Sequence, residues 1–201
     1  MADWPKVGPV KVKPCSRDLE WLPVALSDDR ALLADHAHCE KKAASGAISF
    51  IARFSTEPRL VSAMADLAAE EIAHFAEVHR LLLARGGTLG LDHGDPYAQA
   101  LIALAGGDTK VDRMIDRLLI AGLIEARSYE RLVLLAEHHP DPELTEMFGR
   151  LARQEGAHGE LFVDLARALG PSVELVDARL EALIALEHRI IEDNPIRCAM
   201  H

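Results

Sequence analysis

The sequence contains few cysteines, few aromatic residues and no long apolar run. Its three cysteines, Cys15, Cys39 and Cys198, are widely spaced and odd in number. They offer neither a disulfide framework nor a Cys-x-x-Cys redox or zinc motif, which suits a reducing cytosol. No apolar stretch reaches the ~18 residues that a membrane span needs, and no basic segment followed by an apolar run opens the chain. We therefore expect a cytoplasmic protein that does not enter a membrane.

Aromatic residues make up only 4% of the chain, although 49% of its residues are hydrophobic. Abundant Ala, Leu, Glu and Arg favour helix over sheet. At 201 residues the chain suits one domain, residues 1–201, with a substantial core. Its net charge of -10 argues against nonspecific affinity for polyanions. We expect a single all-α domain.

A Glu-x-x-His tetrapeptide occurs at residues 71–74 and again at residues 155–158. Residues i and i+3 share one face of a helix, so the two side chains of each copy can bind the same metal. A sequence with this many Glu and His residues should contain roughly one such tetrapeptide by chance. However, each copy follows a lone Glu by nearly the same interval, from Glu40 to Glu71 and from Glu125 to Glu155. That interval fits one helix, a turn and half of the next helix, so each pair would lie level on an antiparallel hairpin.

Two such hairpins would bring four Glu and two His to one height, the arrangement of carboxylate-bridged di-iron four-helix bundles. Buried carboxylates need compensating cations, and Glu and His ligands suit iron or manganese. By analogy with such bundles, Glu71 and Glu155 bridge the two metals. One lone Glu and one His complete each metal. The candidate metal ligands and catalytic residues are Glu40, Glu71, His74, Glu125, Glu155 and His158.

Helix caps and stops divide the chain into helices joined by short turns and one long crossover. Ser27 resembles an N-cap, Pro58 and Pro142 suit first helical positions, and glycines follow two of the helices. A crossover over residues 86–108 contains a short apolar run at 98–105. The expected ferritin-like bundle spans residues 27–170, with helices at 28–54, 58–85, 109–137 and 142–169 and an additional C-terminal helix in the segment 171–193.

Prolines at positions 5, 9, 14 and 23 predict that residues 1–26 form an extended N-terminal arm. This arm is locally basic, which fits either a solvated segment or contact with an anionic partner. A second basic stripe is expected on the third bundle helix. Together the arm and the stripe would form one basic surface from Lys6, Lys11, Lys13, Arg17, Lys110, Arg113, Arg117, Arg127 and Arg131.

Several residues near the candidate ligands have two interpretations. Small residues on ligand faces would leave space beside the metals, but they are also compatible with ordinary helix packing; these are Ala43, Ala44 and Gly122. Glu70 and Gln154 could each reach the ligand His of the other hairpin, or they could lie on the surface. Tyr129 lies one turn after Glu125, but the radical tyrosine of ribonucleotide reductases follows the first ligand His, where this chain has Val78.

Two strings go beyond the general bundle pattern. They are Asp35-His36-Ala37-His38-Cys39-Glu40-Lys41-Lys42-Ala43-Ala44 and Ile124-Glu125-Ala126-Arg127-Ser128-Tyr129-Glu130-Arg131. With residues 155–158 they resemble the MiaE-type tRNA hydroxylases, over about residues 35–170. The resemblance implies a ferritin-like di-iron monooxygenase that hydroxylates the isopentenyl group of 2-methylthio-N6-isopentenyladenosine beside the tRNA anticodon. It implies two irons held by the six ligands, O2 as co-substrate and an external electron donor such as a reductase or ferredoxin.

The ligand pattern also fits other di-iron proteins. A bacterioferritin-like iron oxidase or store would assemble into a large shell, and a quinone hydroxylase would expose an apolar, membrane-facing helix surface. A rubrerythrin-like peroxidase would bring a Cys-rich iron domain, which this sequence lacks. The oligomeric state stays open at this point.

Overall fold

Residues 10–201, described by a computed structural model, contain seven helices and no strand. The predicted all-α class is therefore confirmed. None of the helices described is both long enough and apolar enough to cross a membrane. The helices are α1 Asp18–Ala25, α2 Asp29–Arg53, α3 Pro58–Ala84, α4 Pro96–Ile102, α5 Lys110–His138, α6 Pro142–Leu169 and α7 Val173–Asp193.

The chain divides into two compact units, each built around one helical hairpin. The first-hairpin unit contains residues 20–93 with residues 196–200. The second-hairpin unit contains the described residues up to Leu19, residues 94–195 and His201. The single domain over residues 1–201 stays a prediction.

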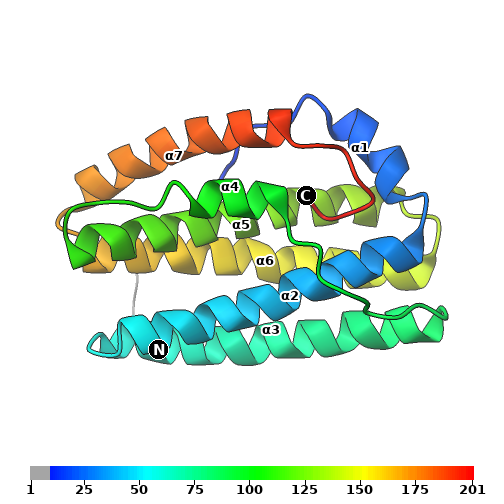
Figure 1. Cartoon of the computed structure of the whole chain (residues 1–201), viewed down its shortest axis with the longest axis horizontal. Helices are drawn as coiled ribbons and strands as arrows, with labels where there is room; N and C mark the ends of the chain where they lie inside the picture. Colours follow the sequence, from blue (N-terminus) through cyan, green and yellow to red (C-terminus); the bar gives the residue numbers. More distant parts are fainter. Residues whose placement is uncertain (1–9) are drawn as a thin grey trace. The chain divides into compact units, whose positions relative to one another are not determined.

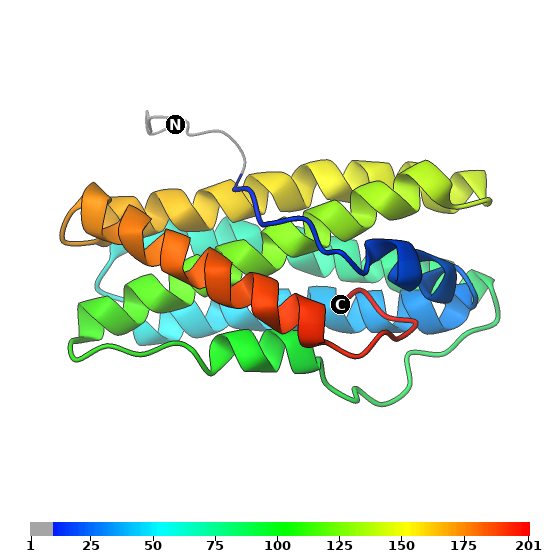
Figure 2. The same cartoon turned by 90° about the horizontal axis from the view of Figure 1, so that it is seen from above.

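In the first-hairpin unit, α2 and α3 pack side by side and run in opposite directions (Figures 1 and 2). The expected N-cap, Ser27, is wrong. Asp28 caps α2 because its carboxylate accepts from the backbone N–H groups of Arg30 and Ala31, whereas the Ser27 hydroxyl donates to the Val24 carbonyl. Pro58 occupies the first turn of α3, and Gly86 adopts a φ of 72° just after the helix, as a C-terminal stop requires.

In the second-hairpin unit, α5 and α6 form the antiparallel pair (Figure 1). Thr109 and Asp112 form a capping box at the start of α5, and Asp141 caps α6 with Pro142 in its first turn. The two backbones approach closely at glycines. A Cβ at Gly122 would lie 3.1 Å from the Gly159 carbonyl oxygen, and a Cβ at Gly159 would lie 3.2 Å from that of Gly122. Gly122 therefore serves helix packing rather than a space beside the metals.

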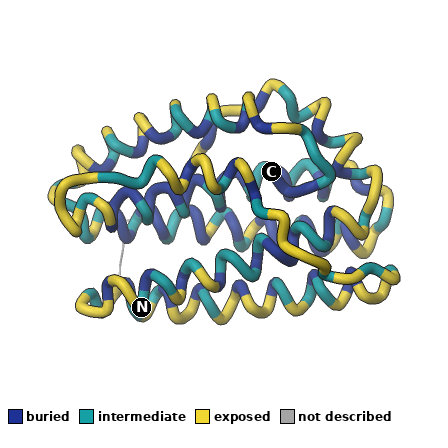
Figure 3. The backbone as a smooth tube through the Cα atoms, in the orientation of Figure 1, coloured by how far each residue is buried: buried dark blue, intermediate teal, exposed yellow. Residues whose placement is uncertain are grey.

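The additional helix α7 packs against α4, α5 and α6, as expected of a helix that covers the bundle. The Arg179 guanidinium of α7 bonds both carboxylate oxygens of Asp116 on α5, at 2.7 and 2.8 Å. Helix α4 within the crossover was not expected. Asp95 caps it and Pro96 occupies its first turn, so a short helix forms where the sequence suggested only an apolar run. Buried positions line the packed faces within each unit, and exposed positions line their outer faces (Figure 3).

The expectation of an extended N-terminal arm is wrong for its last part. Residues 18–25 form α1 despite Pro23, which cannot donate its backbone hydrogen bond. The helix is short, and the fully buried Trp21 anchors it by donating from Nε1 to the Ala199 carbonyl at 2.9 Å. Residues 10–17 form neither helix nor strand. The predictions for Pro5, Lys6 and Pro9 concern residues outside the described part of the chain.

Candidate metal centre

The first lone Glu, Glu40, lies buried on α2 against a histidine from the preceding turn. The Nε2 atom of His36 is 2.6 Å from Glu40 Oε1, and both side chains are almost fully buried. Burial by itself would raise the pKa of Glu40. The charge and the hydrogen bond of His36 outweigh it and hold the pKa well below the usual glutamate range, with smaller contributions from His74 and Glu71. Glu40 is thus held as a carboxylate, the form that binds metal.

The first Glu-x-x-His copy faces Glu40 across the hairpin. On α3, Glu71 and His74 are both buried. The Nδ1 atom of His74 lies 3.5 Å from Glu40 Oε2 and 3.6 Å from Glu71 Oε2. One donor atom from each of the three side chains lies within 4.8 Å of the others. The structure thus brings these three predicted residues together within this unit, and we call them the first half-site.

The second half-site consists of Glu125 on α5 with Glu155 and His158 on α6. All three side chains are buried, and His158 Nδ1 lies 3.3 Å from Glu155 Oε2. A Cβ built on Gly159 would lie 3.8 Å from the Glu125 Cβ atom, so Glu125 leaves α5 beside the turn that carries His158. The second hairpin therefore repeats the layout of the first.

The donors in each half-site fit a di-iron centre. Each half-site offers two carboxylates and one imidazole, and thiolates are absent from both. Buried carboxylates gathered at such distances repel one another unless cations compensate their charge. Oxygen and imidazole donors of this kind suit iron or manganese.

Comparisons with known proteins decide the family. The family model described as "tRNA-(MS[2]IO[6]A)-hydroxylase (MiaE)" matches residues 8–201. The chain belongs to the MiaE family. It is also 35% identical over 178 residues, which cover 89% of this chain and 85% of the relative, to a Pseudomonas putida protein named tRNA 2-(methylsulfanyl)-N(6)-isopentenyladenosine(37) hydroxylase. The resemblance drawn from the sequence is confirmed.

A solved structure supports the fold of this MiaE-family chain. It is described as protein 43 with aldehyde deformylating oxygenase activity from Synechococcus. It matches with a TM-score of 0.88 at 37% identity and covers 96% of both chains. The expected ferritin-like fold is confirmed, and the neighbour is itself an oxygenase.

A glycine inside a ligand helix, Gly156, makes room for an aromatic ring. A Cβ at this position would lie 3.3 Å from Cδ2 of Tyr129, closer than most such contacts. The Tyr129 ring thus packs against the α6 backbone between Glu155 and His158. This contact explains why a residue of low helix propensity stands beside two ligands.

The residues expected to support the ligand histidines lie elsewhere. Glu70 is exposed on α3. Gln154 accepts a hydrogen bond from Arg150 Nη1 at 3.0 Å, one turn earlier on α6. One supporting contact joins His36 to Glu40, and the i, i+4 spacing of these two residues is its sequence signature.

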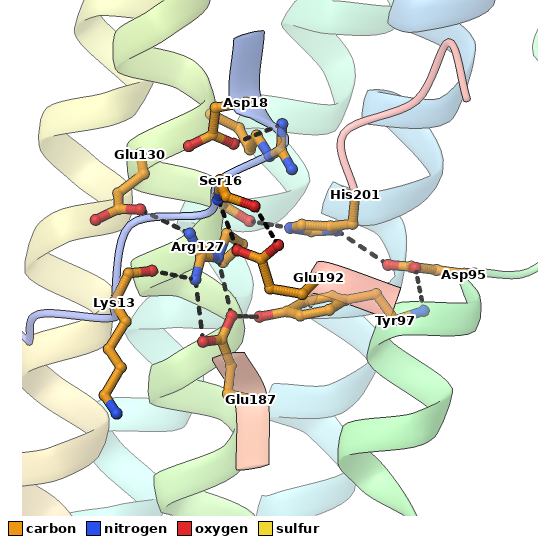
Figure 4. A network of polar contacts seen from close by, with 12 residues as sticks. Lys13, Ser16, Asp18, Asp95, Tyr97, Arg127, Glu130, Glu187, Glu192 and His201 are labelled. Carbon is orange, nitrogen blue, oxygen red and sulfur yellow. Dashed lines mark hydrogen bonds and ion pairs between the residues drawn. The ribbon is translucent and has the colours of Figure 1, made fainter. Parts of the chain in front are cut away.

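The predicted basic stripe on α5 is wrong at its C-terminal end. Arg127 is fully buried and Arg131 nearly so, on the side of α5 away from Glu125. Figure 4 shows the Arg127 guanidinium enclosed by Glu187 of α7, Glu130 and the Lys13 carbonyl, at distances of 2.7 to 3.0 Å. Burial by itself would lower the pKa of Arg127, but Glu187 raises it, so the group stays charged. The helical period places these arginines on one face but does not show that α7 covers it.

The N-terminal end of that stripe is exposed but partly used by the fold. Arg113 donates from Nη1 to the carbonyl oxygens of Gly107 and Asp108, at 2.9 and 3.3 Å, and so holds the end of the crossover. Lys110 is exposed and Arg117 half-buried. A continuous basic surface along α5 is therefore absent.

A buried network joins four residues that the sequence did not single out, Asp95, Tyr97, Glu187 and His201. The Tyr97 hydroxyl donates to Glu187 at 3.0 Å, and the His201 ring stacks on Tyr97 (Figure 4). His201 Nδ1 lies 3.0 Å from Asp95, and its Nε2 lies 3.2 Å from the Ser128 hydroxyl. These contacts join residues far apart in the chain, so no local pattern could have indicated them.

Proposed function

We propose that this chain is an O2-dependent di-iron monooxygenase that hydroxylates the isopentenyl group of 2-methylthio-N6-isopentenyladenosine in tRNA. The reaction joins one oxygen atom of O2 to a carbon of the prenyl group and reduces the other to water. It consumes two electrons and two protons. An external donor, a reductase or a ferredoxin-like protein, would supply the electrons in the cytoplasm. The observation that carries the proposal is the family match over residues 8–201. Two buried clusters, each of two Glu and one His, support it.

In this proposal Glu40, Glu71 and His74 of the first half-site and Glu125, Glu155 and His158 of the second would hold the two irons, with Glu71 and Glu155 as the shared ligands. Two bound irons would supply the activation of O2 that hydroxylation of a C–H bond of the prenyl group requires.

The chain's own residues would prepare and protect that site. His36 holds the Glu40 carboxylate in its charged form and fixes its orientation through the 2.6 Å contact. The close crossing of α5 and α6 fixes the spacing between Glu125 and the Glu155–His158 turn. All six ligand side chains are at most 8% exposed, so bulk water is kept from the reacting atoms.

Analysis of tRNA nucleosides tests the proposal in cells. Cells with the gene should contain the hydroxylated nucleoside, and cells without it should accumulate the 2-methylthio-isopentenyl form, which is lighter by one oxygen atom. Complementation with Glu155→Ala should leave the lighter form, because a ligand is lost. Glu160→Ala, a change of the same kind at a half-buried position of α6, should restore hydroxylation. Identical nucleoside profiles with and without the gene would exclude the proposed reaction.

A second candidate is oxidative removal of the formyl group from an aldehyde, favoured by the 37% identical structure with that activity. Competition between the two substrates distinguishes the candidates. Reduced iron-loaded protein should hydroxylate the tRNA nucleoside and leave a long-chain aldehyde unchanged. Formate release from the aldehyde with no change in the tRNA would favour the second candidate.

A further inference from the structure

Two lysines that directly follow the first metal ligand converge on a single carboxylate. Lys41 Nζ lies 3.0 Å from Asp92 Oδ2, and Lys42 Nζ lies 3.6 Å from Asp92 Oδ1. Asp92 belongs to the segment of residues 86–93 that follows α3, which we call the strap. All these residues belong to the first-hairpin unit.

The neighbouring His38 orients this cluster without adding charge to it. Its Nδ1 atom lies 2.8 Å from Lys41 Nζ, and its Nε2 atom lies 3.1 Å from the Leu89 carbonyl oxygen. An ammonium group can only donate, so Nδ1 accepts, and Nε2 therefore carries the proton and donates to the strap. Neutral His38 thus directs the Lys41 ammonium toward Asp92.

These ion pairs contribute little to holding the fold together. The side chains are 42%, 37% and 28% exposed for Lys41, Lys42 and Asp92. Water screens charges at such exposure, so each pair adds little stability. Among the described residues, Asp92 is the only carboxylate within 4.0 Å of either ammonium, so two positive charges share one negative charge. A phosphodiester fits this excess of positive charge, because it offers several acceptor oxygens to the two ammonium groups.

The strap can release Asp92 at low cost. Residues 88–93 form no regular secondary structure, and Gly90 adopts a positive φ of 65°. Leu91, beside Asp92, is 82% exposed, so moving it breaks little apolar packing. An incoming anion can therefore take the place of the Asp92 carboxylate.

We propose that Lys41 and Lys42 bind one backbone phosphate of the RNA substrate, and that Asp92 occupies this phosphate site in the free protein. The proposal rests on the proposed function, because it names where that substrate is held. Lys42 lies on the side of α2 away from Glu40, and a helix is about 10–12 Å across with its side chains. A phosphate held there lies about one helix diameter from the ligand face, which a nucleotide bearing a prenyl group can span.

Binding of an anticodon stem-loop RNA that carries the prenylated nucleoside tests this site. Fluorescence anisotropy at salt concentrations from about 50 to 200 mM gives both the affinity and its salt dependence. Lys41→Ala/Lys42→Ala should weaken binding at least about tenfold, because charge-assisted contacts are lost. It should also reduce the slope of log affinity against log salt by about 1, the value for one phosphate. The matched control, Arg53→Ala/Arg80→Ala, removes the same charge at two exposed helix positions of the same unit and should leave the slope unchanged.

Asp92→Asn provides a test that misfolding cannot imitate, because it should strengthen binding. The carboxylate no longer competes with the phosphate, so affinity should rise several-fold while iron content stays that of the parent. Equal losses in the two double variants, or an Asp92→Asn protein that binds no tighter than the parent, would overturn this site while the parent still binds and hydroxylates RNA. A parent protein that neither binds nor hydroxylates the RNA would overturn the proposed function as well.

Discussion

The imidazole of His36 lies 2.6 Å from the carboxylate of Glu40, one turn away on α2, and both groups are buried. This contact keeps a candidate metal ligand charged. The negative charge of the lone Glu of the first hairpin is therefore maintained by a residue of the same helix. Its consequence can be measured in the metal-free protein.

Removing His36 should change how the stability of the metal-free protein depends on pH. The pKa of Glu40 is lower in the folded protein than in the unfolded chain, so the carboxylate stabilises the fold above the unfolded pKa of about 4.3. This contribution is lost as pH falls below that value. His36→Leu should therefore flatten the acid side of the stability curve, measured by urea unfolding of chelator-treated protein between about pH 3 and 7.

The control for this comparison is His79→Leu, which removes a half-buried histidine that stacks on Phe75 of α3 rather than on a ligand. It should keep the parent's acid dependence. If His36→Leu and His79→Leu gave the same curve, His36 would not be the group that keeps Glu40 charged.

Alanine at Gly156 should fail to stabilise α6, although alanine is the better helix former. Its Cβ would lie 3.3 Å from the Tyr129 ring, so the gain of about 1 kcal/mol in helix propensity is opposed by crowding. Gly149→Ala in the same helix meets only Ala136, at an ordinary 3.7 Å, and should stabilise the protein by roughly 0.5–1 kcal/mol. Denaturant unfolding gives both values. Equal stabilisation by both changes would contradict the packing role of Gly156.

The buried pair of Arg127 and Glu187 should show strong non-additivity. Arg127→Met alone leaves a fully buried carboxylate without its guanidinium and should cost about 3–5 kcal/mol. Arg127→Met/Glu187→Gln removes both charges and keeps an acceptor for the Tyr97 hydroxyl, so it should be more stable than the single variant. The unfolding free energies of the parent, the two single variants and the double variant complete the cycle.

A more exposed ion pair provides a comparison for that double-mutant cycle. Arg167 contacts Asp177 at 2.7 Å, but the Asp177 side chain is 43% exposed. Arg167→Ala should therefore cost about 1 kcal/mol or less. Costs that simply add for Arg127 and Glu187 would show that the two groups do not depend on each other.

The bundle helices and the ligands could be predicted because their determinants are local. A Glu-x-x-His copy, a proline at a first turn and a glycine after a last turn each act within a few residues. The sequence cannot decide between Ser27 and Asp28 as the N-cap, because both residue types are good caps and they are adjacent. Only the backbone geometry decides between them. The spacing of Glu40, Glu71 and His74 along the sequence was enough to predict their proximity. The lengths of the two helices and of the turn place the three residues at the same level of the hairpin.

The remaining features depend on tertiary contacts. Helix α1 forms around a buried Trp21, and the burial of Arg127 depends on Glu187, which lies 60 residues further along the chain. The place of Gly156 in α6 depends on its contact with Tyr129. The Asp95–Pro96 pair, a cap followed by a first-turn proline, is a local indication of α4.

A reaction of the iron-loaded protein under 18O2 tests the central claim most directly. Reduced protein, supplied with an electron donor and tRNA carrying the 2-methylthio-isopentenyl nucleoside, should yield a nucleoside whose new hydroxyl contains one 18O atom, detected by mass spectrometry. Glu155→Ala should yield none. A hydroxyl oxygen that comes from water, or the absence of any new oxygen while the protein holds two irons, would contradict the account.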